Sequence, residues 1–118
     1  MADEPLMTGN EFLRRYGGEP GFDLVKGRVV TLPMTGGRHG EVGGNVVAAL
    51  RPVIKGNRLG RLGCNHVWIR TRTAPDSIRG ADIVFVSYAT LPADVPTPIG
   101  ELTPPVDLVV EVLQTPDE

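Results

Sequence analysis

Two acidic residues interrupt runs of apolar, β-prone residues, and this pattern constrains the fold more than any other feature of the chain. Asp82 lies in the run 81–86, and Glu111 lies in the run 107–113. A lone buried carboxylate is unfavourable unless a cation, a metal or several hydrogen-bond donors meet it. If the two runs are neighbouring strands, both carboxylates can converge at one end of a sheet. The pattern therefore favours a divalent-metal site, and the alternative is two strand-end acids turned to solvent.

Length and composition are those of one ordinary globular domain over residues 1–118. The chain is 41% hydrophobic with a mean hydropathy of -0.04, and none of its apolar runs approaches the roughly 20 residues that a membrane span needs. The acidic N-terminus lacks the apolar segment of a secretory signal. A single cysteine, Cys64, excludes an intrachain disulfide and suits a reducing compartment. We therefore expect a cytoplasmic protein that does not enter membranes.

Charge is strongly segregated along the chain. Residues 26–80 carry ten bases and two acids, whereas residues 81–118 carry seven acids and no base. Bases on one surface with acids gathered at a site would suit a polyanion held by the former and a metal held by the latter. The alternative, that two oppositely charged halves simply attract each other on folding, explains the charge pattern equally well.

The order of the expected elements indicates an α+β domain. Thr8 and Glu11 form a capping box that predicts a short helix ending near Tyr16. Lys26-Gly27 predicts a hairpin turn. The further elements expected are hairpin strands over 22–25 and 28–32, a helix over 38–54, strands over 61–73, 82–87 and 107–113, and a proline-rich loop over 88–105.

Two features inside these elements carry weaker interpretations. Gly40, Gly43 and Gly44 weaken the helix 38–54, and they suggest that it packs closely against a sheet. Cys64 and His66 share a face of the strand 61–73, which could indicate zinc. Because no second pair of Cys or His residues supports a zinc site, ordinary packing is the favoured interpretation.

Several segments resemble one known family in the same order. They are residues 22–30 followed by Pro33, His39 at the start of the next helix, residues 79–86, and residues 104–113. Together they resemble the Uma-type putative restriction endonucleases, a branch of the PD-(D/E)XK nuclease superfamily. The resemblance covers roughly residues 8–116.

The resemblance implies a restriction-endonuclease-like core, in which helices flank a mixed β-sheet, and a site that uses Mg²⁺ or Mn²⁺ to hydrolyse phosphodiester bonds. Asp82 and Glu111 would be the metal-binding and catalytic carboxylates, and His39 would be a further catalytic residue. Asp23 stands where the family keeps an acid near the site. Asp107 shares a strand face with Glu111, which makes both it and Asp23 candidates for supporting the metal ligands.

The chain also departs from the family pattern in two places. The superfamily's lysine, two residues after the second acid, would fall on Leu113. The C-terminal helix and strands that continue the family's fold are missing, so we expect a truncated domain. An exposed sheet edge or apolar face would then favour a homo-oligomer.

Three function classes remain open at this point. The first is a metal-dependent endonuclease whose partner is DNA. The second is a catalytically inactive, truncated remnant that at most binds nucleic acid or a metal. The third is an interaction module that uses the proline-rich loop 88–105.

Overall fold

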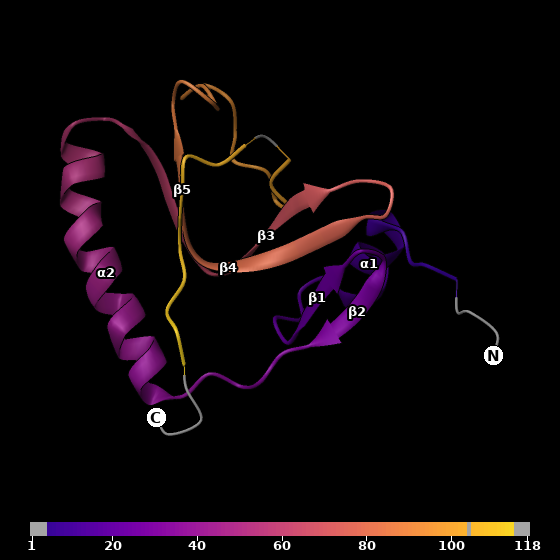
Figure 1. Ribbon diagram of the computed structural model, residues 1–118. Helices are drawn as coiled ribbons and strands as arrows, with labels where there is room; N and C mark the ends of the chain where they lie inside the picture. Colours follow the sequence, from indigo (N-terminus) through magenta and orange to yellow (C-terminus); the bar gives the residue numbers. More distant parts are fainter. Residues whose placement is uncertain (1–4, 104, 115–118) are drawn as a thin grey trace.

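The computed structural model describes residues 5–103 and 105–114, in which two helices and five strands form an α+β domain (Figure 1). The sheet order is β2-β1-β4-β3, and β5 pairs with β4 beside this path. The expected α+β class is confirmed. The segment expected to close the chain after Gln114 lies outside the described residues. The elements are α1 (Gly9–Tyr16), β1 (Phe22–Val25), β2 (Arg28–Thr31), α2 (Gly37–Gly56), β3 (Gly60–Arg72), β4 (Ser77–Ser87) and β5 (Leu108–Val110).

The strand pairing is antiparallel throughout the named strands. The parallel part of the expected mixed sheet is reduced, among the described residues, to one isolated bridge between Ile69 and Leu102. Strand β4 begins at Ser77, five residues before the expected strand at Asp82, because β3 and β4 form one long hairpin closed by a turn at residues 73–76. Strand β4 is thus the centre of the sheet and contacts β1, β3 and β5.

The N-terminal helix and hairpin form where the sequence predicts them. The Thr8 hydroxyl accepts a hydrogen bond from the Glu11 N–H at 3.2 Å and caps α1. Lys26 and Gly27 both have positive φ, at 49° and 80°, which is the geometry of a tight two-residue hairpin turn. Phe12 from α1 packs on Leu24 of β1 and Ile78 of β4, and these buried residues form one of two apolar clusters.

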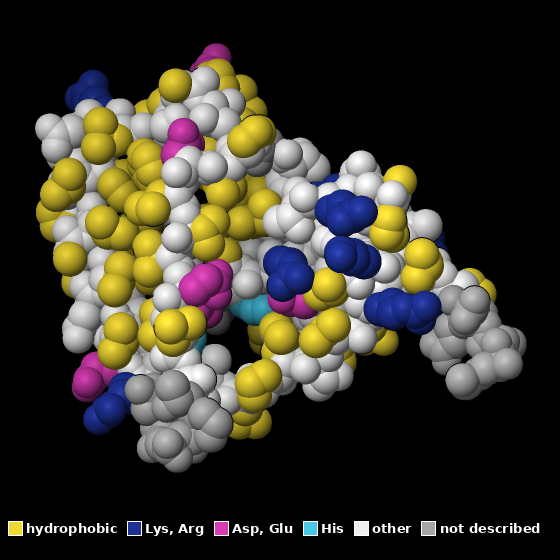
Figure 2. Space-filling view, in the orientation of Figure 1, with side chains coloured by type: hydrophobic (Ala, Val, Ile, Leu, Met, Phe, Trp, Pro, Cys, Tyr) yellow, Lys and Arg dark blue, Asp and Glu magenta, His cyan; other side chains and the backbone are white. Residues whose placement is uncertain are grey.

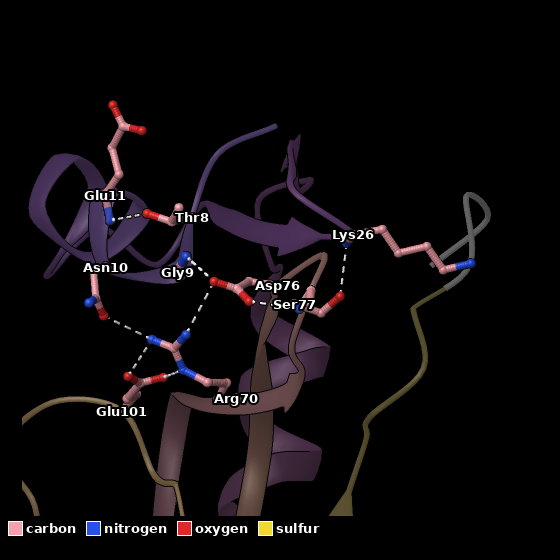
Figure 3. A network of polar contacts seen from close by, with 10 residues as sticks. Thr8, Gly9, Asn10, Glu11, Lys26, Arg70, Asp76, Ser77 and Glu101 are labelled. Carbon is pink, nitrogen blue, oxygen red and sulfur yellow. Dashed lines mark hydrogen bonds and ion pairs between the residues drawn. The ribbon is translucent and has the colours of Figure 1, made fainter. Parts of the chain in front are cut away.

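One guanidinium joins α1 and the long loop to the far end of the β3–β4 hairpin (Figure 3). Arg70 donates to both carboxylate oxygens of Glu101, at 2.9 and 2.8 Å, and to Asn10 at 3.2 Å. Asp76 accepts the Gly9 N–H at 2.7 Å and lies 3.4 Å from Arg70. The backbone N–H groups of Gly9 and Ala74 lower the pKa of Asp76 below its ordinary value.

The loop that follows β4 is anchored to the sheet near its two ends. Leu91 and Leu102 are buried in the second apolar cluster, with Ile69, Ala81, Val84 and Val86. Arg61 donates to the Pro92 carbonyl at 2.7 Å. Residues 92–100, between these anchors, are exposed.

Helix α2 is less buried than its sequence suggests. It stands at one side of the molecule (Figure 1), where it contacts β3 and β4, and Ile54 is its only buried residue. The molecule is only 19 Å thick along its shortest axis. A Cβ added at Gly40, Gly43 or Gly44 would meet nothing within 4 Å, so the expected close packing of these glycines is wrong. In the described part of the chain, no helix has the length and apolar character to cross a bilayer.

Candidate metal and nucleic-acid site

The two acids singled out in the sequence lie opposite each other, Asp82 on β4 and Glu111 directly after β5. The β4–β5 register pairs Val84 with Val109 and Ile83 with Val110. One step further along this register, Asp82 stands opposite Glu111. We expected Glu111 inside a strand that runs to residue 113, but β5 ends at Val110.

The early end of β5 coincides with a hydrogen bond to a side chain of β4. The backbone N–H of Val112 donates to the Oδ2 atom of Asp82 at 2.8 Å, so it is not available to a backbone carbonyl of the sheet. The Asp82 side chain on β4 therefore replaces the next backbone hydrogen bond between the two segments. This contact holds the segment after β5, which carries Glu111, beside Asp82.

The negative charge of Asp82 acts on the carboxylate of Glu111. Partial burial and the negative charge of Asp82 raise the pKa of Glu111, and the charge of Asp23 adds to the effect. A like charge at short range disfavours ionisation, and a cation between the two groups would remove that penalty. The pair thus has the electrostatic character of a cation site.

His39 also reaches this site, from the first turn of α2. Its Nε2 atom lies 3.2 Å from Asp82 Oδ2. A carboxylate only accepts hydrogen bonds, so Nε2 carries the proton in this contact. Both His39 and Val112 donate to Oδ2 of Asp82.

Asp23 lies on β1 and is 7% exposed. Its Oδ1 atom accepts the Gly80 N–H at 2.9 Å and lies 3.1 Å from Nε2 of His66. The structure therefore brings Asp23 near Asp82 and Glu111, with its direct contacts made to Gly80 and His66.

Asp107 does not join the site. Its carboxylate accepts the Ser87 N–H at 2.6 Å and lies 3.2 Å from the hydroxyls of Ser87 and Thr90. The Ser87 N–H is the main cause of its lowered pKa. The expectation that Asp107 supports Glu111 is contradicted, because the side chain instead fixes the turn that follows β4.

A cavity of about 690 Å³ opens beside Asp82. His39, Asp82 and His66 line it, together with residues of α2 and of the segment after β2. Figure 2 shows histidine atoms in a hollow between acidic side chains, with Lys and Arg side chains on the adjoining surface. Sequence reasoning assigned His66 to packing, because an even strand gives no sign that this side chain turns toward Asp23.

The donors present suit a hard divalent cation only in part. Asp82 and Glu111 supply carboxylate oxygens, which Mg²⁺ and Mn²⁺ prefer. Within residues 5–103 and 105–114, no group of three or more His, Cys, Asp or Glu side chains could hold a metal ion. Mg²⁺ commonly binds through one or two carboxylates and completes its shell with water and substrate oxygens, and the two acids fit that mode.

Comparison with known proteins gives two matches. A model of the Uma2 family, described as "Putative restriction endonuclease", matches residues 10–118. The crystal structure of a putative nuclease belonging to DUF820 from Anabaena variabilis superposes with a TM-score of 0.76 at 23% identity. The match covers 95% of this chain and 60% of that protein, so the chain spans about three fifths of the solved structure's length. No curated protein matches the chain.

Proposed function

The chain belongs to the Uma2 family of putative restriction endonucleases, and on this premise we propose that it is a metal-dependent endonuclease that hydrolyses phosphodiester bonds of DNA. The observation that carries this proposal is that Asp82 and Glu111 lie opposite each other, with Asp82 lining a cavity. A structural pair of acids would be expected to have cationic partners. Glu111 instead has a raised pKa beside a second carboxylate.

In the proposed site, Asp82 and Glu111 would hold Mg²⁺ or Mn²⁺. When bound, the ion would supply Lewis-acid stabilisation of charge on the phosphate and lower the pKa of a bound water. His39 donates to Oδ2 of Asp82 and orients this carboxylate from the α2 side. The Val112 N–H donates to the same oxygen and fixes the carboxylate from the β5 side.

Exposed bases on the sheet would supply the proposed contacts to the DNA backbone. Arg28, Arg72 and Arg79 are exposed on strands β2, β3 and β4, and Figure 2 shows Lys and Arg side chains on the surface that adjoins the hollow. Phosphate contacts of this kind position a strand without reading its sequence. DNA as the substrate, together with the single free cysteine Cys64, suits a cytoplasmic location.

A second candidate function is nucleic-acid binding without cleavage. Leu113, at the position of the superfamily's lysine, is 83% exposed. It cannot orient a water molecule or offset phosphate charge. Without another group in that role, the site would bind a cation and DNA but turn over slowly.

Cleavage of supercoiled plasmid with Mg²⁺ or Mn²⁺ separates the two functions. An endonuclease gives relaxed and linear products that disappear on chelation of the metal and in the Asp82→Ala variant. Salt-sensitive DNA binding without those products would favour the second function. Cleavage that survives Asp82→Ala would sink the site assignment.

A further inference from the structure

The hairpin of β3 and β4 contains a strained bulge directly opposite Asp82. The register passes from Cys64 paired with Ile83 to Val67 paired with Ala81. Asn65 and His66 therefore stand across from the single residue Asp82, and they have φ values of 74° and 58°. Two consecutive non-glycine residues in this region are unusual. Bulges of this kind re-aim side chains, and strained backbone concentrates at functional sites.

The bulge turns the His66 ring toward β1. Nε2 lies 3.3 Å from the Phe22 carbonyl oxygen, which accepts its hydrogen bond, and 3.1 Å from Oδ1 of Asp23, an ion-pair distance. Because both partners only accept hydrogen bonds, Nε2 carries a proton. The second ring nitrogen, Nδ1, makes no hydrogen bond to the described residues.

Gly80 makes room for this arrangement from the β4 side. A Cβ at position 80 would overlap the His66 ring, so a larger residue there would displace the imidazole. The Gly80 N–H also donates to Asp23 at 2.9 Å. Gly80, two positions before Asp82 on β4, thus donates to Asp23 and also leaves the space that the His66 ring occupies.

We propose that His66 is the proton acceptor for the attacking water in the reaction of this site, and that Asp23 is its positioning residue. The inference rests on the proposed nuclease function. A carboxylate that holds one ring nitrogen protonated leaves the other with its lone pair free for a proton, the arrangement that general-base histidines use. His66 lines the same cavity as Asp82 and His39. Its imidazole supplies a polar group that can act on the water, which Leu113, at the position of the superfamily's lysine, cannot.

The proposed step is a hydrolysis. The water oxygen forms a bond to phosphorus, and its proton passes to Nδ1 of His66. The bond between phosphorus and the leaving sugar oxygen breaks, with the electron pair staying on that oxygen. The leaving oxygen takes a proton from solvent, and His66 returns its own proton to solvent.

The His66→Gln variant tests this role while keeping the fold. The glutamine amide can still donate to Asp23, but it has no basic nitrogen in place of Nδ1. We expect kcat for plasmid cleavage to fall by about 100-fold or more with KM nearly unchanged. Added imidazole should restore part of the rate to His66→Ala and none to Asp82→Ala.

Trp68→Phe is the matched control, because Trp68 Nε1 donates to the same Phe22 carbonyl at 3.3 Å. It should keep the wild-type kcat. A His66→Gln enzyme with the wild-type kcat would overturn the role of His66 while leaving the nuclease function intact. A wild-type protein that cuts no DNA would instead overturn the nuclease function, and this inference with it.

A second measurement does not depend on activity. Nitrogen–proton NMR of the imidazole should show neutral His66 with its proton on Nε2, and Gly80→Ala should shift both ring nitrogens by displacing the ring. A proton on Nδ1 of the neutral ring would leave no lone pair there to accept the water's proton, and it would overturn the proposal whatever the cleavage rate.

Discussion

The carboxylate of Asp82 accepts the backbone N–H of Val112 at 2.8 Å, across the gap between β4 and the segment after β5. One side chain therefore ends a strand and places the second acid of the candidate site. Because the same oxygen also contacts His39, the function of Asp82 and its structural role can be separated only by substitutions that keep an acceptor.

Asp82→Asn should separate these roles. Its amide oxygen can still accept the Val112 N–H, so we expect a free energy of unfolding within about 1 kcal/mol of wild type. Loss of the negative charge should abolish the stabilisation by Mg²⁺ and Mn²⁺, measured as the change in Tm on metal addition. Asp82→Ala should lose both the acceptor for the Val112 N–H and the stabilisation by metal. Its lower free energy of unfolding in urea, compared with Asp82→Asn, would measure what the acceptor contributes to stability. An asparagine variant that retains the metal-induced shift would exclude Asp82 as a ligand.

Glu111→Gln should stabilise the metal-free protein. The pKa of Glu111 is raised by partial burial of its carboxylate and by Asp82, so its ionised form is less favourable in the folded protein than in the unfolded chain. The residue as a whole is solvent-exposed, so solvent screening limits the gain, and we expect a Tm rise of roughly 1–4 °C without metal. With Mg²⁺ the order should reverse, because only the wild type keeps both carboxylates. Glutamate at position 101, paired with Arg70, is a matched control whose replacement by Gln should lower Tm.

Asp76 should make stability fall in acid. Its pKa is lowered by the Gly9 and Ala74 N–H groups and by Arg70. The ionised form is therefore favoured in the folded state. Its contribution is fully present above the unfolded value of about 3.9 and is lost as pH falls through the lower folded value. Urea unfolding should show a smaller loss between neutral pH and acid for Asp76→Asn, which is already weaker at pH 7 by about 1 kcal/mol. Equal acid sensitivity in both proteins would contradict this.

Two glycines should respond in opposite directions to alanine. A Cβ at Gly60 would overlap the backbone of Val86 and Ser87, which cannot move without breaking the β3–β4 pairing, so Gly60→Ala should cost about 1–3 kcal/mol. At Gly44, inside α2, a Cβ meets nothing within 4 Å, so Gly44→Ala should gain about 0.5–1 kcal/mol. Chemical denaturation measures both. A neutral Gly60→Ala variant would mean that β3 begins later than Gly60.

The chain should self-associate through the free edge of β5. In the described residues β5 pairs with β4 on one side only, and Leu108 and Val109 are 44% and 41% exposed. Apolar, unpaired edges favour pairing between chains, and an edge lysine opposes it. Sedimentation at micromolar concentration should show dimers or larger species for wild type and monomers for Val109→Lys. Val30→Lys on β2, an equally exposed edge valine, should not dissociate them. A monomeric wild type would end this proposal.

Local patterns in the sequence predicted the elements well. The Thr8 cap and the Lys26-Gly27 turn are decided within a few residues, and both formed where expected. The apolar run 107–113 did not form a full strand, because a side-chain acceptor on another strand, Asp82, took the Val112 N–H. That competition is tertiary and leaves no local mark in the sequence.

The sequence likewise predicted some residues of the candidate site and missed others. Asp82, Glu111 and His39 lie together, as the strand pattern and the family resemblance led us to expect, whereas Asp107 turned to Ser87. His66 was missed because its orientation depends on a bulge. The two residues Asn65-His66, both tolerant of positive φ, are the only local signal that could have suggested it.

The guanidinium contacts of Arg70 have a consequence for local unfolding of the domain. A single guanidinium contacts the start of α1, the β3–β4 turn and the loop at Glu101, so none of these can detach without leaving charged groups unpaired in the others. Amide protons in α1, such as that of Phe12, should then exchange with deuterium at rates that track those of Leu102, which donates to the Trp68 carbonyl at 2.8 Å. Segments some 90 residues apart in sequence would thus behave as one cooperative opening unit.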